Sequence, residues 1–271
     1  MFRKLKVTLK KWWEQEKDKR YPNNLAVLAI AKNESMVIKE WIEHYLWQGA
    51  EKVFIIDNGS TDSTIDQILE FKNTGKVEVI SLPERHKQRA HYWTAINHFR
   101  IRQRFRWLLV ADVDEFWFCK DGRSVGDALN NDEFRDIDVI YVSWSLFGSN
   151  GLKTQPKNVR TAFTKRSRDL FQSHNTKYVC RTKVLRELNN LGIHKINGVD
   201  SSRKTSANQT FQLNHYAIQS LEYFTKVKMT RGAADHVKHE HVRDLAYFER
   251  YDQSGSEVED RLLADRVKEA S

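Results

Sequence analysis

Three carboxylates stand in an otherwise apolar stretch of the sequence, WLLVADVDEFWF, which covers residues 107–118. They are Asp112, Asp114 and Glu115, and a single valine separates the two aspartates. Burying an ionised carboxylate without a partner is costly, so an apolar segment should carry such a cluster only at its exposed end or against a cation. The spacing indicates that this cation is a metal ion.

An Asp-x-Asp pair at a strand end can hold a divalent metal through one carboxylate while the other acts through water or a ribose hydroxyl. Mg²⁺ and Mn²⁺ prefer oxygen ligands and usually take only one or two protein carboxylates, with phosphate oxygens as further ligands. Asp112 and Asp114 therefore predict a metal held between the protein and a diphosphate. An alternative is that Asp114 and Glu115 only cap the turn. The buried strand before the pair favours the metal.

The elements that must position these carboxylates follow from an alternation of apolar runs and amphipathic stretches. Runs at 25–31, 52–57, 77–82 and 107–111 predict strands, and the patterns at 36–46, 65–69 and 88–105 predict helices between them. This alternation predicts an α/β fold with a mostly parallel sheet flanked by helices on both faces. Shorter strands at 138–144, 176–182 and 210–216 should follow, and then C-terminal helices near 220–233, 242–251 and 256–269.

Polar clusters follow three of the predicted strands, and in such sheets ligands bind at the carboxyl ends of the strands. Lys32, Asn33 and Glu34 end the first strand, residues 57–62 end the second, and residues 112–115 end the fourth. We therefore expect all three clusters to line one crevice.

Composition narrows the class of protein. The chain has 271 residues, 40% of them hydrophobic, which predicts one compact globular unit. The net charge of +9 and the pI near 9.4 favour an anionic partner such as nucleic acid, a membrane surface or a phosphate-bearing substrate. No apolar run of about 18 residues or signal-peptide core is present, so we expect a cytoplasmic protein. Two cysteines fit a reducing compartment.

The chain divides into three predicted parts: a basic amphipathic segment at 1–22, the α/β domain at 23–235 and a helical extension at 236–271. Within residues 1–20, Phe2, Leu5, Leu9, Trp12 and Trp13 form one helical stripe, and lysines spread over the other side. This pattern is typical of a helix lying on an anionic membrane surface, here the inner membrane face. It equally suits a helix packed on its own domain.

Several motifs occur in the order of a known family. They are AKNE (31–34), EW (40–41), IIDNGSTD (55–62), DVDEF (112–116), the W-x-x-F-G of 144–148 and NHY (214–216). From about residue 25 to 232 the chain resembles the family 2 and family 92-like nucleotide-sugar glycosyltransferases. The resemblance implies the GT-A fold, a nucleotide-sugar donor at the strand ends, and Mn²⁺ or Mg²⁺ on the Asp-x-Asp.

Carried onto this sequence, the resemblance implies roles for single residues. The nucleotide would be surrounded by Ala31, Lys32, Asn33, Glu34, Asp57, Asn58 and Asp62. Asp112 would approach the ribose or the metal, Asp114 would ligate the metal, and a histidine would complete it, His215 in preference to His194. A lone histidine beside a strand is more often a hydrogen-bonded core residue than a metal ligand. Further cations for the diphosphate are Lys177, Arg181, Lys226 and Arg231.

An inverting transferase also needs a carboxylate that takes the proton of the acceptor hydroxyl. The resemblance places this base downstream of the metal motif, where Asp200 is the first candidate, Asp169 the second, and Glu115 a third. Asp200 also suits the capping of a turn at residues 198–201. The inverting mechanism is therefore an expectation rather than a consequence of a motif.

The sequence thus predicts a metal-dependent glycosyltransferase that moves a sugar, from a UDP-sugar by default, to a glycan or lipid-linked acceptor in surface polysaccharide synthesis. One alternative is a nucleotidyltransferase, which would usually show a glycine-rich phosphate loop after the first strand. AKNESMV, residues 31–37, has no glycine. A second alternative is a non-enzymatic basic module that binds a membrane or nucleic acid, although we expect no nucleic-acid partner.

Overall fold

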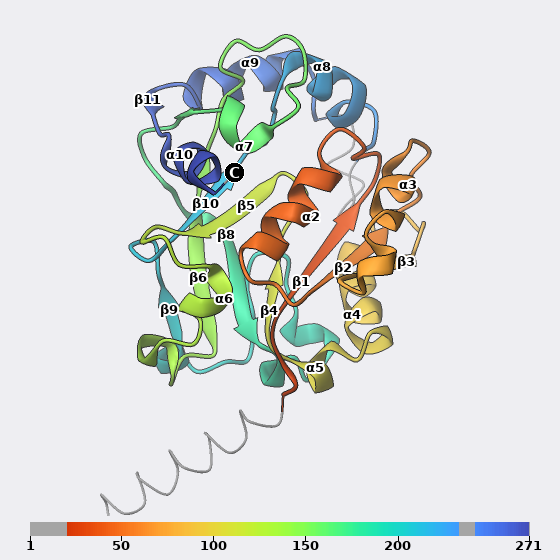
Figure 1. Ribbon diagram of the computed structural model, residues 1–271, viewed down its shortest axis with the longest axis vertical. Helices are drawn as coiled ribbons and strands as arrows, with labels where there is room; N and C mark the ends of the chain where they lie inside the picture. Colours follow the sequence, from red (N-terminus) through yellow and green to blue (C-terminus); the bar gives the residue numbers. More distant parts are fainter. Residues whose placement is uncertain (1–20, 233–241, 271) are drawn as a thin grey trace, which may run out of the picture.

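The computed structural model of the protein describes residues 21–232 and 242–270 and is shown in Figure 1. The predicted basic segment at residues 1–20 and the start of the predicted helical extension, residues 236–241, lie outside the described residues. In the described ranges the chain forms a large sheet with helices on both of its faces, so the predicted fold class is confirmed.

Nine strands of the described chain form the large sheet, in the order β3-β2-β1-β4-β8-β6-β10-β5, with β9 paired to β6. The strands are β1 (Asn23–Ala31), β2 (Lys52–Asp57), β3 (Val77–Ser81), β4 (Phe105–Val110), β5 (Glu115–Cys119), β6 (Val139–Leu146), β8 (Phe171–Arg181), β9 (Lys204–Ser206) and β10 (Phe211–His215). Strands β3, β2, β1 and β4 are parallel, while β8 runs antiparallel to β4 and β6. A separate two-stranded ribbon joins β7 (Lys165–Arg166) to β11 (Val258–Glu259).

The helices connect the strands and continue beyond the last of them. They are α2 (Ile38–Trp47), α3 (Thr64–Leu69), α4 (Gln88–His98), α5 (Ile101–Arg104), α6 (Val125–Ala128), α7 (Val159–Ala162), α8 (Leu221–Tyr223), the π-helical turn η6 (Phe224–Lys228), α9 (Leu245–Ser254) and α10 (Leu262–Glu269). Gly49, at φ 82°, follows the end of α2, as its position in the sequence predicts.

Strand β1 shows why the sheet is buried on both faces. Its alternate residues Val27 and Ala29 join the apolar cluster that contains α2, while Ala26 and Leu28 join the cluster that contains α4. Successive side chains of a strand point to opposite faces, so a strand covered on both sides reads as a continuous apolar run. The run at 25–31 is therefore apolar throughout because helices cover both faces.

The strand order creates a switch point between β1 and β4. From β1 the chain moves outward to β2 and then to β3, and it afterwards crosses to the other side of β1 to form β4. In open α/β sheets, ligands bind in the crevice outside the carboxyl ends of the strands at such a point. Here those ends carry residues 31–34 after β1 and residues 111–114 after β4.

Two elements differ from the sequence prediction. The apolar run at 107–118 was expected to contain one strand, but the chain turns at residues 112–115 and forms β5, which pairs antiparallel with β10. The helix predicted at 88–105 ends at His98, and Arg100 takes the left-handed conformation at φ 53° before the short α5. Both differences arise where a change of chain direction interrupts an apolar pattern.

No helix in residues 21–232 and 242–270 is long and apolar enough to cross a membrane.

Candidate active site

A cavity of about 520 Å³ opens at the carboxyl ends of β1 and β4. Its volume lies within the range of about 300–1,000 Å³ that is usual for small-molecule sites. The strand ends contribute Ala31, Lys32, Glu34, Asn58, Asp112 and Asp114 to its wall. The C-terminal half of the chain contributes Trp144, His194, His215, Lys228, Arg231, Arg243, Tyr247 and Tyr251. The predicted crevice is therefore present.

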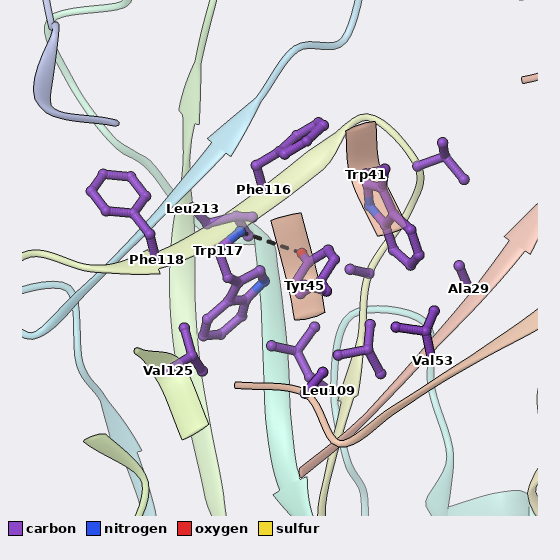
Figure 2. Close-up of a cluster of buried hydrophobic side chains, with 14 of the residues drawn as sticks. Ala29, Trp41, Tyr45, Val53, Leu109, Phe116, Trp117, Phe118, Val125 and Leu213 are labelled. Atoms are coloured by element: carbon purple, nitrogen blue, oxygen red, sulfur yellow. Dashed lines mark hydrogen bonds between the residues drawn. The ribbon is translucent and has the colours of Figure 1, made fainter. Parts of the chain in front are cut away.

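Helix α2 holds the turn that carries the carboxylates. The indole nitrogen of Trp41 donates to the carbonyl oxygens of Asp112 (3.0 Å) and Glu115 (3.1 Å), and the Tyr45 hydroxyl donates to that of Glu115 (2.9 Å). Figure 2 shows both rings among the buried side chains, with the Tyr45 hydroxyl also accepting from the backbone N–H of Trp117. Four hydrogen bonds from one helix thus fix the backbone from residue 112 to residue 117.

Lys177 on β8 is the partner of Asp112. Its side chain is 0% exposed, and its Nζ lies 2.7 Å from Asp112 Oδ2 and 3.6 Å from Glu115 Oε2. Burial alone would raise the pKa of Asp112, but the charge of Lys177 and its hydrogen bond hold this pKa below the ordinary value. Asp112 is therefore an ionised carboxylate whose side chain is still 33% exposed toward the cavity.

Glu115 has a different environment. Its Oε1 accepts from the Trp144 indole at 2.8 Å, and its Oε2 accepts from the backbone N–H of Asp112 at 2.9 Å. The side chain is fully buried and does not line the cavity. Burial raises the pKa of Glu115 well above its usual value, in spite of Lys177. Through these contacts Glu115 stabilises the turn that carries Asp112 and Asp114.

Asp114 lies deeper than Asp112, with a side chain that is 7% exposed. Its Oδ2 is paired with the ammonium group of Lys228, and His215 Nε2 lies 3.6 Å from Oδ1. Oδ1 itself is buried and, within the part of the chain that the structure describes, accepts no hydrogen bond. Burial opposes ionisation of Asp114, but Lys228 and His215 together bring its pKa far below the ordinary value.

The chain from Ser220 to Arg231 fastens the C-terminal half onto the first strand end. The Tyr223 hydroxyl donates to Glu34 Oε2 at 2.6 Å, and Arg231 forms an ion pair with Glu34 Oε1. Together with the pair between Lys228 and Asp114, these contacts join the ends of β1 and β4 to one short segment. The cavity therefore has a wall that is held by ionic contacts.

Among the described residues, cationic side chains outnumber acidic ones around this cavity. The cationic ones are Lys32, Arg85, Lys228, Arg231 and Arg243, and the acidic ones are Glu34, Asp112 and Asp114. Such an excess of positive charge in a partly enclosed space favours an anionic ligand. The arrangement suits a group such as a diphosphate beside the Asp-x-Asp.

The residues around Asp114 fit a divalent cation. A buried carboxylate oxygen without a partner and an imidazole nitrogen 3.6 Å away are two adjacent donors. Across residues 21–232 and 242–270, no group of three or more His, Cys, Asp or Glu side chains is placed to hold a metal ion by itself. The chain thus offers two donors, and Mg²⁺ or Mn²⁺ commonly takes its remaining ligands from substrate phosphates and water. Asp114 and His215 would hold such an ion.

The comparison with protein families decides the assignment of the chain. The model of glycosyltransferase family 92 matches residues 27–252, which include the strand ends, the Asp-x-Asp, His215 and α9. The chain belongs to glycosyltransferase family 92.

Curated members of family 92 are longer than this chain. A family 92 protein from Ricinus communis is 26% identical over 229 residues, which are 80% of this chain and 39% of the relative. A family 92 protein from Arabidopsis thaliana is 28% identical over 144 residues, 50% of this chain and 23% of the relative. The chain thus spans less than half the length of these relatives.

Solved structures show more distant likeness. Residues 1–349 of S. aureus TarS in complex with UDP-GlcNAc match with a TM-score of 0.42 and 12% identity, over 84% of this chain and 70% of that one. Glucosyl-3-phosphoglycerate synthase from Mycobacterium tuberculosis, in complex with Mn²⁺, UDP-glucose and phosphoglyceric acid, matches with a TM-score of 0.37 and 14% identity, over 60% and 58% of the chains.

The nucleotide-binding residues expected from the resemblance fall into two groups in this family 92 chain. Ala31, Lys32, Glu34, Asn58 and Asp112 line the cavity. Asn33, Asp57 and Asp62 instead hold the loops behind it. Asn33 accepts from the backbone N–H of Thr61 at 2.8 Å, Asp57 from that of Ser60 at 3.0 Å, and Asp62 from that of Ser35 at 3.2 Å.

The three base candidates do not meet at the cavity. Asp200 is exposed and accepts from the backbone N–H of Ser202 at 2.8 Å, which is the turn-capping alternative seen in the sequence. Asp169 is also exposed, and neither it nor Asp200 nor Glu115 lines the cavity. The carboxylates that do line it, Glu34, Asp112 and Asp114, are each paired with a cation.

Both candidate histidines line the cavity, but they have different neighbours. His215 faces Asp114, whereas His194 is held through Nδ1 by the carbonyl oxygen of Thr176 at 3.0 Å. Trp144 lies beside both imidazoles, with ring centroids 4.1 Å from His215 and 5.6 Å from His194. His215 is therefore the histidine that lies beside Asp114, and its role as a metal ligand stays a prediction.

Among the cations, the sequence prediction missed Lys228. Lys226 was named instead, but its side chain is 62% exposed and pairs with Glu222, whereas that of Lys228 is 3% exposed. Arg181 is buried under Trp107 and donates to the carbonyl oxygens of Phe134 and Ile137, away from the cavity. The helical spacing of the sequence did not predict that Lys228 is buried, because the π-helical turn η6 changes which side chains face inward.

Helix α9 was also absent from the predicted site. Tyr247 and Tyr251 line the cavity with stacked rings, 4.2 Å between centroids, and Phe248 packs the helix onto the apolar cluster around Phe224. Aromatic residues four apart on a helix are a usual core pattern, so the sequence could not distinguish a cavity wall from a core face.

Proposed function

We propose that the chain acts as a metal-dependent glycosyltransferase that transfers a sugar from a nucleotide diphosphate sugar to a glycan or lipid-linked acceptor, as in surface polysaccharide synthesis. Family membership supports the class of reaction. The observation that carries the metal dependence is the unpartnered Oδ1 of Asp114 beside His215, within a cavity rich in cations. UDP is the nucleotide expected from the resemblance.

The geometry supports a division of labour among the chain's own residues. Lys228, Arg231 and Arg243 line the cavity where they would neutralise the diphosphate that leaves the sugar. Asp112, held by Lys177, would orient the ribose or a water molecule, and Trp41 and Tyr45 keep its backbone in place. A bound Mn²⁺ or Mg²⁺ would supply Lewis-acid stabilisation of the same leaving group.

The acceptor hydroxyl must lose its proton, and an inverting mechanism assigns this step to a carboxylate. Asp200, Asp169 and Glu115 remain the proposed bases. None of them lines the cavity. Asp200 or Asp169 would therefore have to approach the acceptor through a loop movement, and Glu115 would act only if its hydrogen bonds to Trp144 and to the backbone of Asp112 were broken.

Ligand-dependent stabilisation tests the proposed donor and metal together. We expect UDP with Mn²⁺ to raise the melting temperature by several degrees, because a ligand at about 100 times its Kd stabilises the folded state by about 2.7 kcal/mol. UDP without metal should give a smaller shift. The measurement is a thermal denaturation series with UDP, GDP and UTP, each with Mn²⁺ or with EDTA.

The series also separates the alternatives. A nucleotidyltransferase would be stabilised by the nucleoside triphosphate in preference to the diphosphate. If neither UDP nor GDP shifts the melting temperature in the presence of Mn²⁺, the proposed donor site is wrong.

We also propose that residues 1–20 bring the enzyme to an anionic membrane surface, at the inner face, where lipid-linked acceptors lie. The support is the basic amphipathic pattern of the sequence, in which each lysine near the surface adds about 1 kcal/mol of attraction. Deleting residues 1–20 should release the protein from phosphatidylserine-containing vesicles at physiological salt, and vesicles of phosphatidylcholine alone serve as the control. Equal sedimentation of the two forms with the anionic vesicles would contradict the membrane role.

A further inference from the structure

Lys228 is a buried cation with one anionic contact among residues 21–232 and 242–270. Its side chain is 3% exposed, and its ammonium group is paired with Asp114 Oδ2. It ends the π-helical turn η6, in which the backbone N–H of Met229 bonds to the carbonyl oxygen of Phe224 at 2.9 Å. Single π-turns are frequent at functional sites because they redirect side chains within a helix. Here the turn directs Lys228 into the cavity wall while Lys226 faces solvent.

The same carboxylate is the one that fits a divalent cation. Asp114 has Oδ2 on Lys228 and Oδ1 unpartnered beside His215. A divalent ion on Oδ1 would add two positive charges beside the ammonium group, in a place with little water to screen them. Lys228 and a metal ion therefore compete for Asp114.

The other cations of this wall have no such conflict. Arg231 is paired with Glu34, and Arg243 contacts the carbonyl oxygen of Gly232 at 3.4 Å. Lys228 alone of these three is paired with the carboxylate that the metal would use. Once a metal takes Asp114, a buried ammonium group needs a new anion, since an unpaired buried charge is costly.

We infer that Lys228 is an exchangeable counter-cation, which neutralises Asp114 while the donor is absent and transfers to the diphosphate when the metal and the nucleotide bind. This inference rests on the proposed function. A lysine suits the role because its ammonium is a point charge on a flexible stem. The exchange couples the binding of the two ligands. Metal binding releases the ammonium group of Lys228 from Asp114 for the diphosphate, and the diphosphate holds Lys228 away from the carboxylate that the metal would use.

The substitution Lys228→Met tests the exchange with two binding measurements on the full chain. Free Mn²⁺ measured by electron paramagnetic resonance, without nucleotide, gives the metal affinity, and calorimetric titration of UDP into Mn²⁺-saturated protein gives the nucleotide affinity. We expect Mn²⁺ to bind about tenfold more tightly in the variant and UDP about tenfold more weakly, which is about 1.4 kcal/mol in opposite directions.

Lys226→Met is the matched control, because it removes a lysine two residues away that pairs with Glu222 at the surface. It should leave both affinities unchanged. A residue that only supports the fold would weaken both ligands when removed, so the opposite signs are specific to the exchange. If Lys228→Met leaves Asp114 unpaired and the protein does not fold, Lys228→Gln keeps a hydrogen-bond donor and is measured in the same way.

The outcomes separate this inference from the proposed function. Wild-type binding of Mn²⁺ and UDP, together with unchanged or jointly weakened affinities in the folded variant, overturns the exchange and leaves the proposed function standing. Failure of the wild-type chain to bind either ligand overturns both.

Discussion

Replacing Asp114 with asparagine should reduce sugar transfer by about 10³-fold at saturating donor and Mn²⁺, because it would remove the ionised ligand of the proposed metal, which would contribute several kcal/mol to transition-state stabilisation. The side chain keeps its shape, and the turn is held by Trp41 and Tyr45 through backbone groups rather than through this carboxylate. The loss of the negative charge opposite the buried Lys228 should lower the stability, but because the turn itself is retained we expect a folded protein with normal circular dichroism. The measurement is transfer or donor hydrolysis with a UDP-sugar over a range of Mn²⁺ concentrations.

Asp136→Asn is the matched control for this prediction. Asp136 is an exposed aspartate that does not line the cavity, so its replacement should change the rate by no more than about threefold. Asp200→Asn tests the first proposed base, and a large loss of transfer with intact UDP binding in that variant would support Asp200 as the base. Near wild-type transfer by Asp114→Asn would contradict the metal site.

Replacing Lys177 with methionine should lower the free energy of unfolding by about 3–5 kcal/mol, because it leaves the fully buried Glu115 and the partly exposed Asp112 without their cation. Lys177 is 0% exposed and lies 2.7 Å from Asp112 and 3.6 Å from Glu115. The corresponding fall in melting temperature is on the order of 10 °C for a domain of this size. Chemical denaturation of the variant and the wild type measures the difference.

The loss should depend on pH in a direction set by these carboxyl groups. The pKa of Glu115 is already raised by burial and loses the opposing effect of Lys177 in the variant, so the native variant binds protons more readily than the unfolded chain does. A group whose folded pKa is raised stabilises the native state as pH falls through that pKa. The deficit of Lys177→Met should therefore be smaller at pH 5.5 than at pH 8.

Lys183→Met provides a surface comparison for Lys177. Lys183 also pairs with an aspartate, Asp138 at 3.0 Å, but its side chain is 43% exposed and Arg203 remains on the same carboxylate. Its loss should cost no more than about 1 kcal/mol. Equal costs for Lys177→Met and Lys183→Met, or a deficit of Lys177→Met that grows as pH falls, would contradict the buried cluster described above.

The sequence by itself determined the parallel part of the sheet, β1 to β4, and the sheet edge at which the candidate site lies. Buried strands read as continuous apolar runs, helices repeat at a different period, and the rule that ligands bind at the carboxyl ends of parallel strands joins residues 31–34 to residues 112–114. The order of the motifs along the chain was enough to indicate the resemblance to family 92. These signals are local in the chain, so they can be seen without a structure.

The tertiary structure alone decided which charges meet. Lys177 and Asp112 are 65 residues apart and Lys228 and Asp114 are 114 residues apart, and no spacing in the sequence relates them. The π-helical turn η6 buries Lys228 while Lys226 stays exposed, and residues 112–115 form a turn before β5. The side chains of Asn33, Asp57 and Asp62 hydrogen-bond to loop backbone and do not line the cavity. The physical reason is that the energy of a buried charge depends on its partner in space. That partner is set by the packing of the whole chain.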